Sequence, residues 1–446
     1  MQNKTQMKYR RLTAFIMLCA LVSAHGNEMN QAEVNATKHV DQAIGELIES
    51  NRDAITKHRT AQVQLLLRPK VAAKVTQIKH DFWFGTALNR ELFREEEEER
   101  GGKGFSAKDK AMYKQIVLEN FNSAVHENAL KWQCTEVKKG EVDYTLTDRV
   151  ADWCITNDLR LRGHTVFYPQ DNYIQKWIKE LDDKELHSTL NQRATSVMTH
   201  FKGRITEYDV NNEMLNPKSY FKGRLGERIR PEMFKWCRDA DPDAILYMND
   251  NGILNFGNYR NYAKQIQQLI DQGAPIGGIG VQGHFFTPEQ VNPKTIGDAL
   301  DRLSQFNLPI KVTEFDISTP DEVAKAKGLA TVYTMCFAHP SVEGILMWGF
   351  WQGKHWRPTA FLWKNDWTPT LAAETYQRLV FKEWWTRWNG TAGLNGQAEL
   401  RAFFGEQRVE VDGKSRSFYL SPSEKSVMID CRDPDPAKWV KRVSKH

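Results

Sequence analysis

Residues 205–213 read ITEYDVNNE, and residues 310–318 read IKVTEFDIS. Each stretch begins with an apolar or β-branched run, and a glutamate follows that run, Glu213 in the first stretch and Glu314 in the second. Short runs of this composition are typical of buried β-strands. The two stretches therefore predict two strands that each carry a carboxylate toward the carboxyl end.

Six other stretches have the same character, and amphipathic segments such as residues 186–201 and 259–273 separate them. Eight strands alternating with helices over roughly 300 residues predict an α/β fold, the (β/α)8 TIM barrel. An open doubly wound sheet is the main alternative, but it needs a glycine-rich phosphate turn after its first strand, and FGTALN at residues 84–89 is no such turn. The six further strand candidates are FWFGTAL (82–88), FNSAVHE (121–127), RLRGHTVF (160–167), AILYMNDN (244–251), IGGIGVQGH (276–284) and EGILMWGFW (343–351).

The two ends of the chain differ from this repeat. Residues 1–24 place basic residues before the short apolar run LTAFIMLCALV and then small residues, which predicts a secretory signal peptide. Residues 25–80 contain a helical segment and two short β segments, and residues 386–446 alternate strands with turn glycines. We therefore expect a small N-terminal helix/β appendage at 25–80, the barrel at 81–385 and a small C-terminal β extension at 386–446.

The composition is that of an ordinary globular protein. Hydrophobic residues make up 41% and charged residues 26% of the 446 residues. The net charge of +5 comes from scattered basic residues, so neither a nucleic-acid partner nor a membrane partner is indicated. No segment after the predicted signal peptide is apolar enough to span a membrane. The oligomeric state is not defined by these features.

The cysteines and histidines do not cluster at the spacing of a metal site, and no nucleotide-binding loop occurs. We therefore expect a site that works without a metal or cofactor. We expect most of the cysteines to be buried thiols. The sequence does not decide whether Cys134 and Cys154 form a disulfide. The cysteines that follow the predicted signal peptide are Cys134, Cys154, Cys237, Cys336 and Cys431.

Polar side chains gather at the predicted strand ends. Function on a TIM barrel is located at the carboxyl ends of the strands, whereas a purely structural barrel would scatter such groups. We expect Asn249 and Asp250 to hold the loop of Glu213 through hydrogen bonds, and Asp316 to be a structural partner. The residues at these ends are Asn89, Glu127, Asn128, Lys131, His164, Asn212, Glu213, Asn249, Asp250, Gln282, His284, Glu314, Asp316 and Trp348.

The two isolated glutamates suit the hydrolysis of a glycosidic bond. One carboxyl must protonate the leaving oxygen, and the second must attack the anomeric carbon or activate water. Carboxyl groups about 5–5.5 Å apart give retention of configuration, and a gap of about 6.5–9.5 Å gives inversion. The fourth and seventh strands face each other across a barrel mouth, so Glu213 and Glu314 can flank one sugar.

With these motifs assembled, the chain resembles glycoside hydrolase family 10, the endo-β-1,4-xylanase family, from about residue 82 to residue 379. YDVNNEM (208–214) resembles the acid/base motif and VTEFDIS (312–318) the nucleophile motif of a retaining enzyme. The other matching segments are HENALKW (126–132), RGHT (162–165), GVQGHF (280–285) and WGFWQGKHWRP (348–358).

The resemblance implies a role for each matched position. Glu213 is implied as general acid/base, Glu314 as nucleophile, and Asn212 as a ligand of the sugar 2-hydroxyl. His284 is implied to bond the nucleophile and keep it ionised. The remaining substrate-binding positions are Glu127, Asn128 and Lys131 in the glycone subsites, His164, Tyr168 and Gln282, and the walls Trp348 and Trp356.

The sequence also departs from the family pattern. Tyr168 and Pro169 stand where the family usually has Trp and His, and Asn211 stands where Val is common. Tyr168 can still stack on a sugar, but with less area. The segment around it and NGQAELRAFFGEQRVEV (395–411) are closer to the plant-type subgroup.

These features predict a secreted enzyme that cleaves internal β-1,4 bonds of xylan and binds xylan or xylooligosaccharides. A barrel glycosidase acting on another β-1,4-glycan or on short xylooligosaccharides is one alternative. A non-catalytic polysaccharide-binding protein is a second, and a scaffolding role centred on residues 386–446 is a third.

Overall fold

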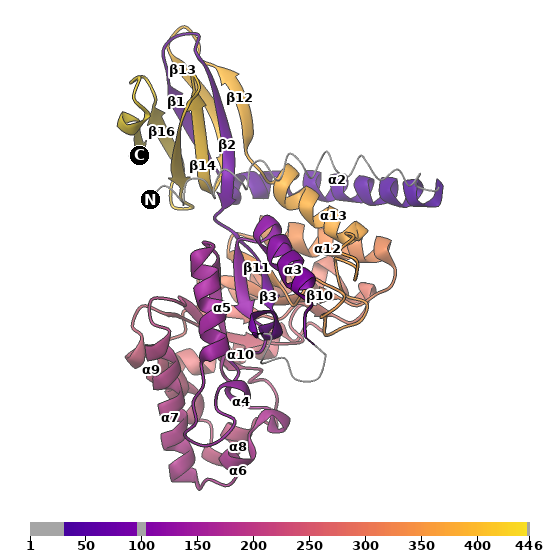
Figure 1. Ribbon diagram of the computed structural model, residues 1–446, viewed down its shortest axis with the longest axis vertical. Coiled ribbons are helices and arrows are strands. Elements are labelled where there is room, and N and C mark those ends of the chain that lie inside the picture. Colours follow the sequence, from indigo (N-terminus) through magenta and orange to yellow (C-terminus); the bar gives the residue numbers. More distant parts are fainter. Residues whose placement is uncertain (1–30, 96–103, 444–446) are drawn as a thin grey trace.

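The structure, a computed structural model, describes residues 31–95 and 104–443. For residues 31–37 only the backbone is described. A β-sandwich lies at one end of the long axis and a barrel at the other, with a long helix across their junction (Figure 1). The predicted signal peptide at 1–24 lies outside the described residues.

The barrel confirms the predicted (β/α)8 fold. Among the described residues, eight parallel strands follow one another around it, and the last pairs with the first, β11 with β3. The short strand β9 (His284–Phe285) pairs with the end of the seventh barrel strand. The barrel strands are β3 (Trp83–Leu88), β4 (Ser123–His126), β5 (Arg160–Phe167), β6 (Glu207–Asn212), β7 (Ile245–Asp250), β8 (Gly278–Val281), β10 (Ile310–Ile317) and β11 (Val342–Met347).

Amphipathic helices follow the strands and pack on the outside of the barrel. In α10, for example, Tyr262, Ile266 and Leu269 recur at helical spacing and are buried, so this face packs inward. The longer helices are α3 (Ala107–Asn120), α5 (Thr145–Thr156), α7 (Asp183–His200), α9 (Ile229–Ala240), α10 (Tyr259–Asp271), α11 (Pro293–Ser304), α12 (Glu322–Ala338) and α13 (Leu371–Arg378), the last followed by a π-helical turn, Leu379–Glu383. The short ones are η2 (Arg90–Phe93), α4 (Trp132–Thr135), η4 (Asp171–Tyr173), α6 (Lys176–Lys179), α8 (Tyr220–Leu225) and η5 (Pro288–Gln290).

Charged side chains pair inside the barrel. Arg162 lies 2.8 Å from Glu207 and 2.5 Å from Asp209, and Lys311 contacts the other oxygen of Glu207. The Lys311 ammonium also lies 3.7 Å from the ring centroid of Trp83. All four charged groups are buried, and two cations face two carboxylates, which offsets the cost of taking them out of water.

Strands from both ends of the chain build the sandwich. Strand β1 (Thr60–Leu66) lies between β13 and β16, and β2 (Ala72–His80) lies between β12 and β14. The predicted N-terminal appendage and C-terminal β extension are therefore one unit, because their strands pair with each other around one apolar core. The sheets have the orders β13-β1-β16-β17 and β12-β2-β14-β15. The C-terminal members are β12 (Arg387–Thr391), β13 (Gln397–Phe403), β14 (Gly405–Val411), β15 (Lys414–Leu420), β16 (Ser426–Asp430) and β17 (Val440–Val443), with a short turn η7 (Pro436–Lys438) before the last.

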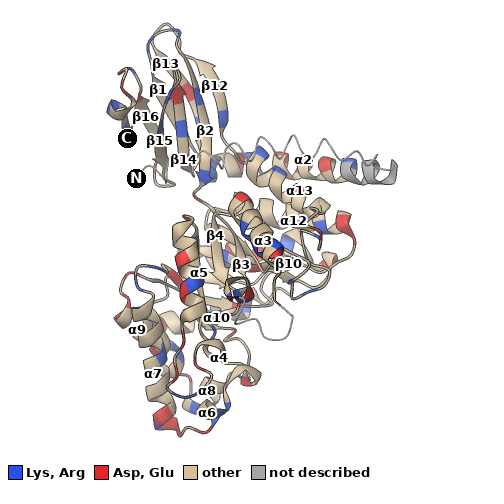
Figure 2. Cartoon of the chain, in the orientation of Figure 1, with Lys and Arg blue, Asp and Glu red and all other residues tan. Residues whose placement is uncertain are grey.

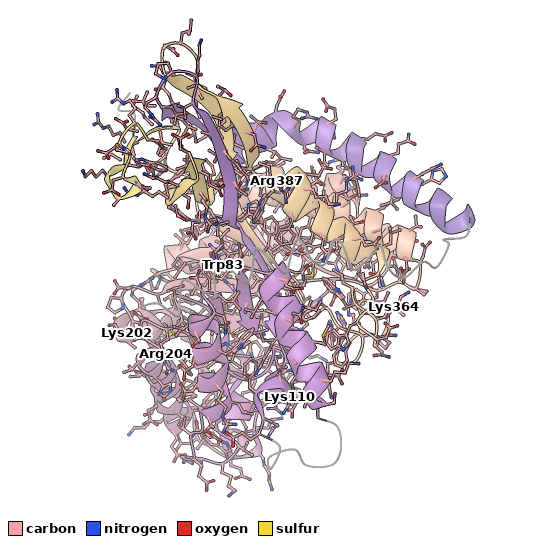
Figure 3. All side chains as sticks on the ribbon, turned by 45° about the horizontal axis from the view of Figure 1, so that its top comes forward. Trp83, Lys110, Lys202, Arg204, Lys364 and Arg387 are labelled. Atoms are coloured by element: carbon pink, nitrogen blue, oxygen red, sulfur yellow. The ribbon has the colours of Figure 1, made fainter. Side chains whose placement is uncertain are left out.

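The sandwich is attached to the barrel at the amino ends of the barrel strands. Only two residues separate the end of β2 from Trp83, the first residue of β3. Trp83 accordingly lies close to the sandwich (Figure 3). The carboxyl ends of the barrel strands therefore face away from the sandwich.

A long helix reinforces this junction. Helix α2 (Gln31–Arg59) covers the predicted helical segment and packs against α12. Its last residue, Arg59, donates to the carbonyls of Phe337 and His339 at 2.5 Å each and of Val342 at 2.7 Å. The guanidinium thereby satisfies two carbonyls at the carboxyl end of α12 and one at the start of β11.

Acidic and basic residues are interspersed along both the sandwich and the barrel (Figure 2). No helix in the described part of the chain is both long and apolar enough to cross a membrane. Within residues 31–95 and 104–443, no group of three His, Cys, Asp or Glu side chains is placed to hold a metal ion. The five cysteines described are free thiols, so the disulfide between Cys134 and Cys154 is not formed.

Candidate active site

Glu213 follows β6 directly and adopts a backbone conformation that side-chain-bearing residues rarely take, with φ of 58°. Its N–H donates to the carbonyl of Asn249 at 2.8 Å. The carboxylate of Asp250 accepts the N–H of Leu215 at 2.7 Å. Two consecutive residues at the end of β7 therefore hold the strained turn that carries Glu213.

Amide donors fix both oxygens of the Glu213 carboxyl group. Gln282 donates to Oε1 at 3.0 Å, and Gln170 donates to Oε2 at 3.1 Å. Asn216 donates to the carbonyl oxygen of the Gln170 amide at 2.6 Å, which fixes the orientation of that amide. The carboxyl group is therefore held in one orientation before any substrate arrives.

Glu314 lies on β10 and is almost fully buried. His284 Nε2 is 3.2 Å from its Oε2, and Asn249 donates to its Oε1 at 2.8 Å. Burial alone would raise the pKa of Glu314, but the hydrogen bond from His284 and nearby positive charge hold that pKa below its usual range. Glu314 is therefore an ionised carboxylate at neutral pH.

His284 stands between two carboxylates. Its Nδ1 is 3.0 Å from Asp316, and its Nε2 faces Glu314. Burial would lower the pKa of His284, but the two carboxylates raise it to about 9. Asp316 in turn accepts from the indole of Trp356 at 2.8 Å and from Arg357 at 3.1 Å. His284 is therefore a cation that supports the ionised state of Glu314.

Two amides connect the candidate carboxylates across the barrel mouth. The Asn249 amide nitrogen donates to both Asn212 Oδ1, at 2.9 Å, and Glu314. The Asn212 amide nitrogen is 3.5 Å from Glu213. The hydroxyl group of Thr313 donates to the side-chain oxygen of Asn249 at 2.6 Å. Glu213 and Glu314 are thus separated by only two buried side chains at one rim.

His164 lies at the same rim above the buried charges of the barrel. Its Nδ1 is 2.9 Å from Asp209, and its ring packs edge-on against Trp348 with centroids 5.0 Å apart. Burial would raise the pKa of Asp209, but the charge of Arg162 keeps that pKa below its usual range. An ionised Asp209 therefore orients the imidazole of His164.

Polar side chains beyond β3 and β4 form a connected row. Asn89 donates to Glu127 at 2.9 Å, Asn128 donates to the other oxygen of Glu127 at 3.1 Å, and Lys131 donates to Asn128 at 3.0 Å. Burial raises the pKa of Glu127, and the charge of Lys131 opposes that shift. This row offers a carboxylate, amides and an ammonium to the hydroxyl groups of a ligand.

Aromatic rings flank these polar groups. The Lys131 ammonium lies 5.7 Å from the ring centroid of Tyr168 and 5.8 Å from that of Trp348. Tyr168 also stacks on Tyr173, with centroids 4.8 Å apart. Trp356 is half exposed and packs against His284 with centroids 4.9 Å apart. The site therefore combines polar groups with flat apolar walls.

The structure brings the predicted site residues to one rim. The expected hydrogen bonds of Asn249 and Asp250 to the loop of Glu213 are present, through the backbone carbonyl of Asn249 and the carboxylate of Asp250, and the side chain of Asn249 in addition bonds Glu314. Gln170, which was not among the predicted site residues, bonds Glu213. Gln170 lies three residues beyond the end of β5, so a search of strand ends misses it.

Comparison with known proteins identifies the family of the barrel. Residues 76–380 match the model of glycosyl hydrolase family 10. Endo-1,4-beta-xylanase 1 of Arabidopsis thaliana is 34% identical over 353 residues, which cover 78% of this chain and 35% of the relative. The anti-sigma-I factor RsgI6 of Acetivibrio thermocellus is 36% identical over 343 residues, 76% of this chain and 42% of that protein. The chain thus spans less than half the length of these curated relatives.

A solved structure gives the same result for the fold. The native xylanase 10B of Thermotoga maritima superimposes with a TM-score of 0.62 at 25% identity, covering 68% of this chain and 96% of that one. The family model extends over well over half of the present chain and contains both candidate carboxylates. The chain belongs to glycosyl hydrolase family 10.

Proposed function

We propose that this protein is a retaining endo-β-1,4-xylanase in which Glu213 is the general acid/base and Glu314 the nucleophile. The observation that carries the proposal is the pair of carboxylates joined through Asn212 and Asn249. One of the pair is kept ionised by His284, as a nucleophile requires.

The first half of the reaction forms a bond between Glu314 and the anomeric carbon. The glycosidic C–O bond breaks, and its electron pair stays with the leaving oxygen, which takes the proton of Glu213. Asn249 keeps Glu314 Oε1 in place, and His284 holds Oε2. Neither contact requires reorganisation when the substrate arrives, so both act as preorganised support.

The second half of the reaction returns the enzyme to its starting state. Glu213, now deprotonated, accepts a proton from a water molecule as that water attacks the anomeric carbon. The bond to Glu314 breaks and its electron pair returns to the carboxylate. Two successive inversions leave the product with the configuration of the substrate.

The polar row beyond β3 and β4 supports the substrate side of the proposal. Glu127, Asn128 and Lys131 present groups that bond sugar hydroxyls, and Tyr168 and Trp348 flank them. Several relatives are named endo-1,4-beta-xylanases, and one similar structure is described as a complex with xylobiose. We therefore assign the sugar on the non-reducing side of the cut to this row.

Kinetics of single variants test the catalytic assignment. Glu314→Ala should lower kcat/KM on xylan by about 10⁴-fold or more, because the covalent step is lost. Glu46→Ala, on the exposed face of α2, is the matched control. Proton NMR of the first-formed product should show the β-anomer, and an α-anomer would overturn the retaining mechanism.

Substrate comparison separates this function from its alternatives. The enzyme should cut xylan and aryl β-xylobiosides, and should act far less on carboxymethylcellulose or aryl β-xylosides. Cleavage of glucans alone would assign the barrel to another β-1,4-glycan. Binding of xylan without any cleavage would favour the non-catalytic polysaccharide-binding alternative.

We also propose that the protein is secreted. The basic residues, apolar run and small residues of positions 1–24 support this proposal. N-terminal sequencing of the protein exported by its host should give a start close to residue 25, and a chain that begins at Met1 would contradict it.

A further inference from the structure

A groove lies where helix α2, the sandwich and the amino end of the barrel meet, away from the candidate active site (Figure 1). This feature, the junction groove, has a volume of about 700 Å³, which is the size of a ligand site. Asp53 and Lys57 line it from the last turns of α2. Arg401 on β13 and Lys425 before β16 line it from the sandwich, and Glu343 on β11 lines it from the barrel. Three separate parts of the fold therefore build one groove.

The junction groove presents charges that the fold itself does not use. Within the described part of the chain, the charged side chains of the groove that have neither a hydrogen bond nor an ion pair are those of Asp53, Lys57, Glu343, Arg401 and Lys425. All of them are exposed. By contrast, Glu424 in the same lining lies 2.6 Å from the ammonium of Lys441. Cations and carboxylates of the described lining are therefore available to bond a ligand.

The presence of both signs of charge decides the class of ligand. An anionic ligand would meet Asp53 and Glu343, and a cationic ligand would meet Arg401 and the two lysines. A sugar hydroxyl group both donates and accepts hydrogen bonds, so it can use guanidinium and ammonium donors beside carboxylate acceptors. A neutral polyhydroxylated ligand therefore fits this lining better than an ion of either sign.

Aromatic residues complete the lining. Phe404 lies between β13 and β14 and is half-buried, and Phe82 directly precedes β3. The N–H of Asp81 donates to the carbonyl of Phe404 at 3.1 Å, and the Phe82 ring packs edge-on against Phe337 with centroids 5.1 Å apart. Pyranose rings present faces of C–H bonds, which pack on aromatic rings. The groove thus offers apolar surface and hydrogen-bonding groups in positions that the fold already fixes.

We propose that the junction groove is a second carbohydrate-binding site, which holds the neutral backbone of a xylan chain at the end of the barrel opposite to Glu213 and Glu314. The choice of xylan rests on the proposed function, because the polymer that the enzyme cuts surrounds it. A short oligosaccharide cannot occupy both sites at once, since they lie at opposite ends of the barrel strands. Two chains of an insoluble particle can, and the second contact then raises the effective concentration of substrate at the rim.

Counting bound oligosaccharides tests this proposal. The Glu314→Ala protein should bind xylohexaose without cutting it, and equilibrium dialysis should give two molecules per chain at saturation. Adding Glu343→Ala/Arg401→Ala removes an acceptor from the barrel side of the groove and a donor from the sandwich side. Both side chains are exposed and unpaired among the described residues, so the fold should persist. The number of bound molecules should then fall to one.

Hydrolysis by Glu343→Ala/Arg401→Ala, with Glu314 intact, provides a second measurement. The rate on insoluble xylan should fall by about tenfold, because the second contact with the particle is lost. The value of kcat/KM on aryl β-xylobioside should stay within about twofold of the wild type, since this substrate occupies only the candidate active site. The matched control is Lys235→Ala/Asp239→Ala, which removes one charge of each sign from exposed positions of α9 and should change neither rate.

Several results would overturn the proposal. One bound xylohexaose per chain both before and after Glu343→Ala/Arg401→Ala would show that the groove holds no xylan. Equal losses on insoluble xylan and aryl β-xylobioside would mean that the substitutions act on the catalytic end instead. Binding of mannohexaose in place of xylohexaose would show that the groove takes a different polysaccharide.

The proposed function can fail separately. If the wild-type protein cuts neither xylan nor aryl β-xylobioside, the xylanase assignment is wrong. If Glu343→Ala/Arg401→Ala nevertheless lowers the number of bound xylohexaose molecules by one, the second carbohydrate-binding site stands without it.

Discussion

The side-chain amide of Gln170 donates to Oε2 of Glu213 over 3.1 Å, on the opposite oxygen from Gln282. Gln170 is itself held by Asn216. The carboxyl group of Glu213 is thus held from two sides by amides that follow different strands, Gln170 after β5 and Gln282 after β8. In the proposed mechanism, these two contacts orient the proton of Glu213 toward the glycosidic oxygen.

Removing one of these two contacts should slow catalysis. Gln170→Ala leaves Oε2 of Glu213 without its amide donor, so the carboxyl group becomes free to rotate away from the productive geometry. We expect kcat on xylan to fall by about 10- to 100-fold with a smaller change in KM, because misplacement of a catalytic group acts on the transition state. Gln267→Ala, on the surface of α10, is the control, and a kcat equal to the wild type would remove Gln170 from the site.

The ionisation of His284 should make the free energy of unfolding decrease at alkaline pH. Its pKa is raised in the folded state to about 9 from an ordinary value of about 6.5. Its contribution is therefore complete below about pH 6.5 and is lost as the pH rises through about 9. The shift corresponds to about 3 kcal/mol of unfolding free energy.

This prediction can be measured by thermal unfolding between pH 6 and pH 10. The Tm difference between the wild type and His284→Gln should be largest at pH 6 and shrink toward pH 10. His187→Gln, on the surface of α7, is the control. A difference that grows with pH would mean that His284 is not the cation that supports Glu314.

Asp250 should act on Glu213 through the backbone. Burial raises the pKa of Asp250 to about 7, while its carboxylate accepts the N–H groups of Leu215 and Asn251. Asp250→Ala leaves these donors without a partner, which should cost about 1–3 kcal/mol of unfolding free energy. It should also lower kcat about tenfold, since the left-handed turn at Glu213 loses its support.

The conservative variant Asp250→Asn distinguishes an effect of Asp250 on the position of Glu213 from an effect on stability alone. Asp250→Asn can still accept from Leu215, but its amide nitrogen faces the N–H of Asn251. We expect it to recover part of the Tm and part of kcat relative to Asp250→Ala. Recovery of the Tm with no recovery of kcat would indicate that the carboxylate itself takes part in the reaction.

Arg59 should matter for stability and not for catalysis. Arg59→Met removes the donors to the carbonyls of Phe337 and His339 at the end of α12 and of Val342 at the start of β11. We expect a loss of about 2–4 kcal/mol of unfolding free energy, because buried carbonyls lose a charged partner. kcat/KM should not change, since this end of the barrel faces away from the site. The control is Arg52→Met, at an exposed position of α2, which should leave the free energy of unfolding unchanged.

The sequence predicted the barrel because each strand carries its own local signal. A stretch such as residues 310–317 is apolar enough to be buried on both faces, and polar groups follow it at a fixed end. The same local rule brought Glu213, Glu314, His164 and His284 to one rim. Periodicity and chain order were sufficient for this part of the prediction.

The sandwich and the amide contacts could not be predicted in the same way. Pairing of β1 with β13 joins residues more than 330 positions apart, and no local pattern specifies such a partner. The contact of the Asn249 side chain with Glu314 depends on how β7 and β10 are placed around the barrel, which no local pattern specifies. Gln170 was missed because its position depends on a loop conformation.

The sandwich also fixes an order of events during synthesis. Strands β1 and β2 leave the ribosome early, but each lies between strands that begin at Arg387 or later. Their exposed edges remain unpaired while the whole barrel sequence is translated, which is when strand edges are prone to aggregate. A nascent chain that stops before Arg387 therefore contains all the residues of the candidate site but lacks the strands that pair with β1 and β2.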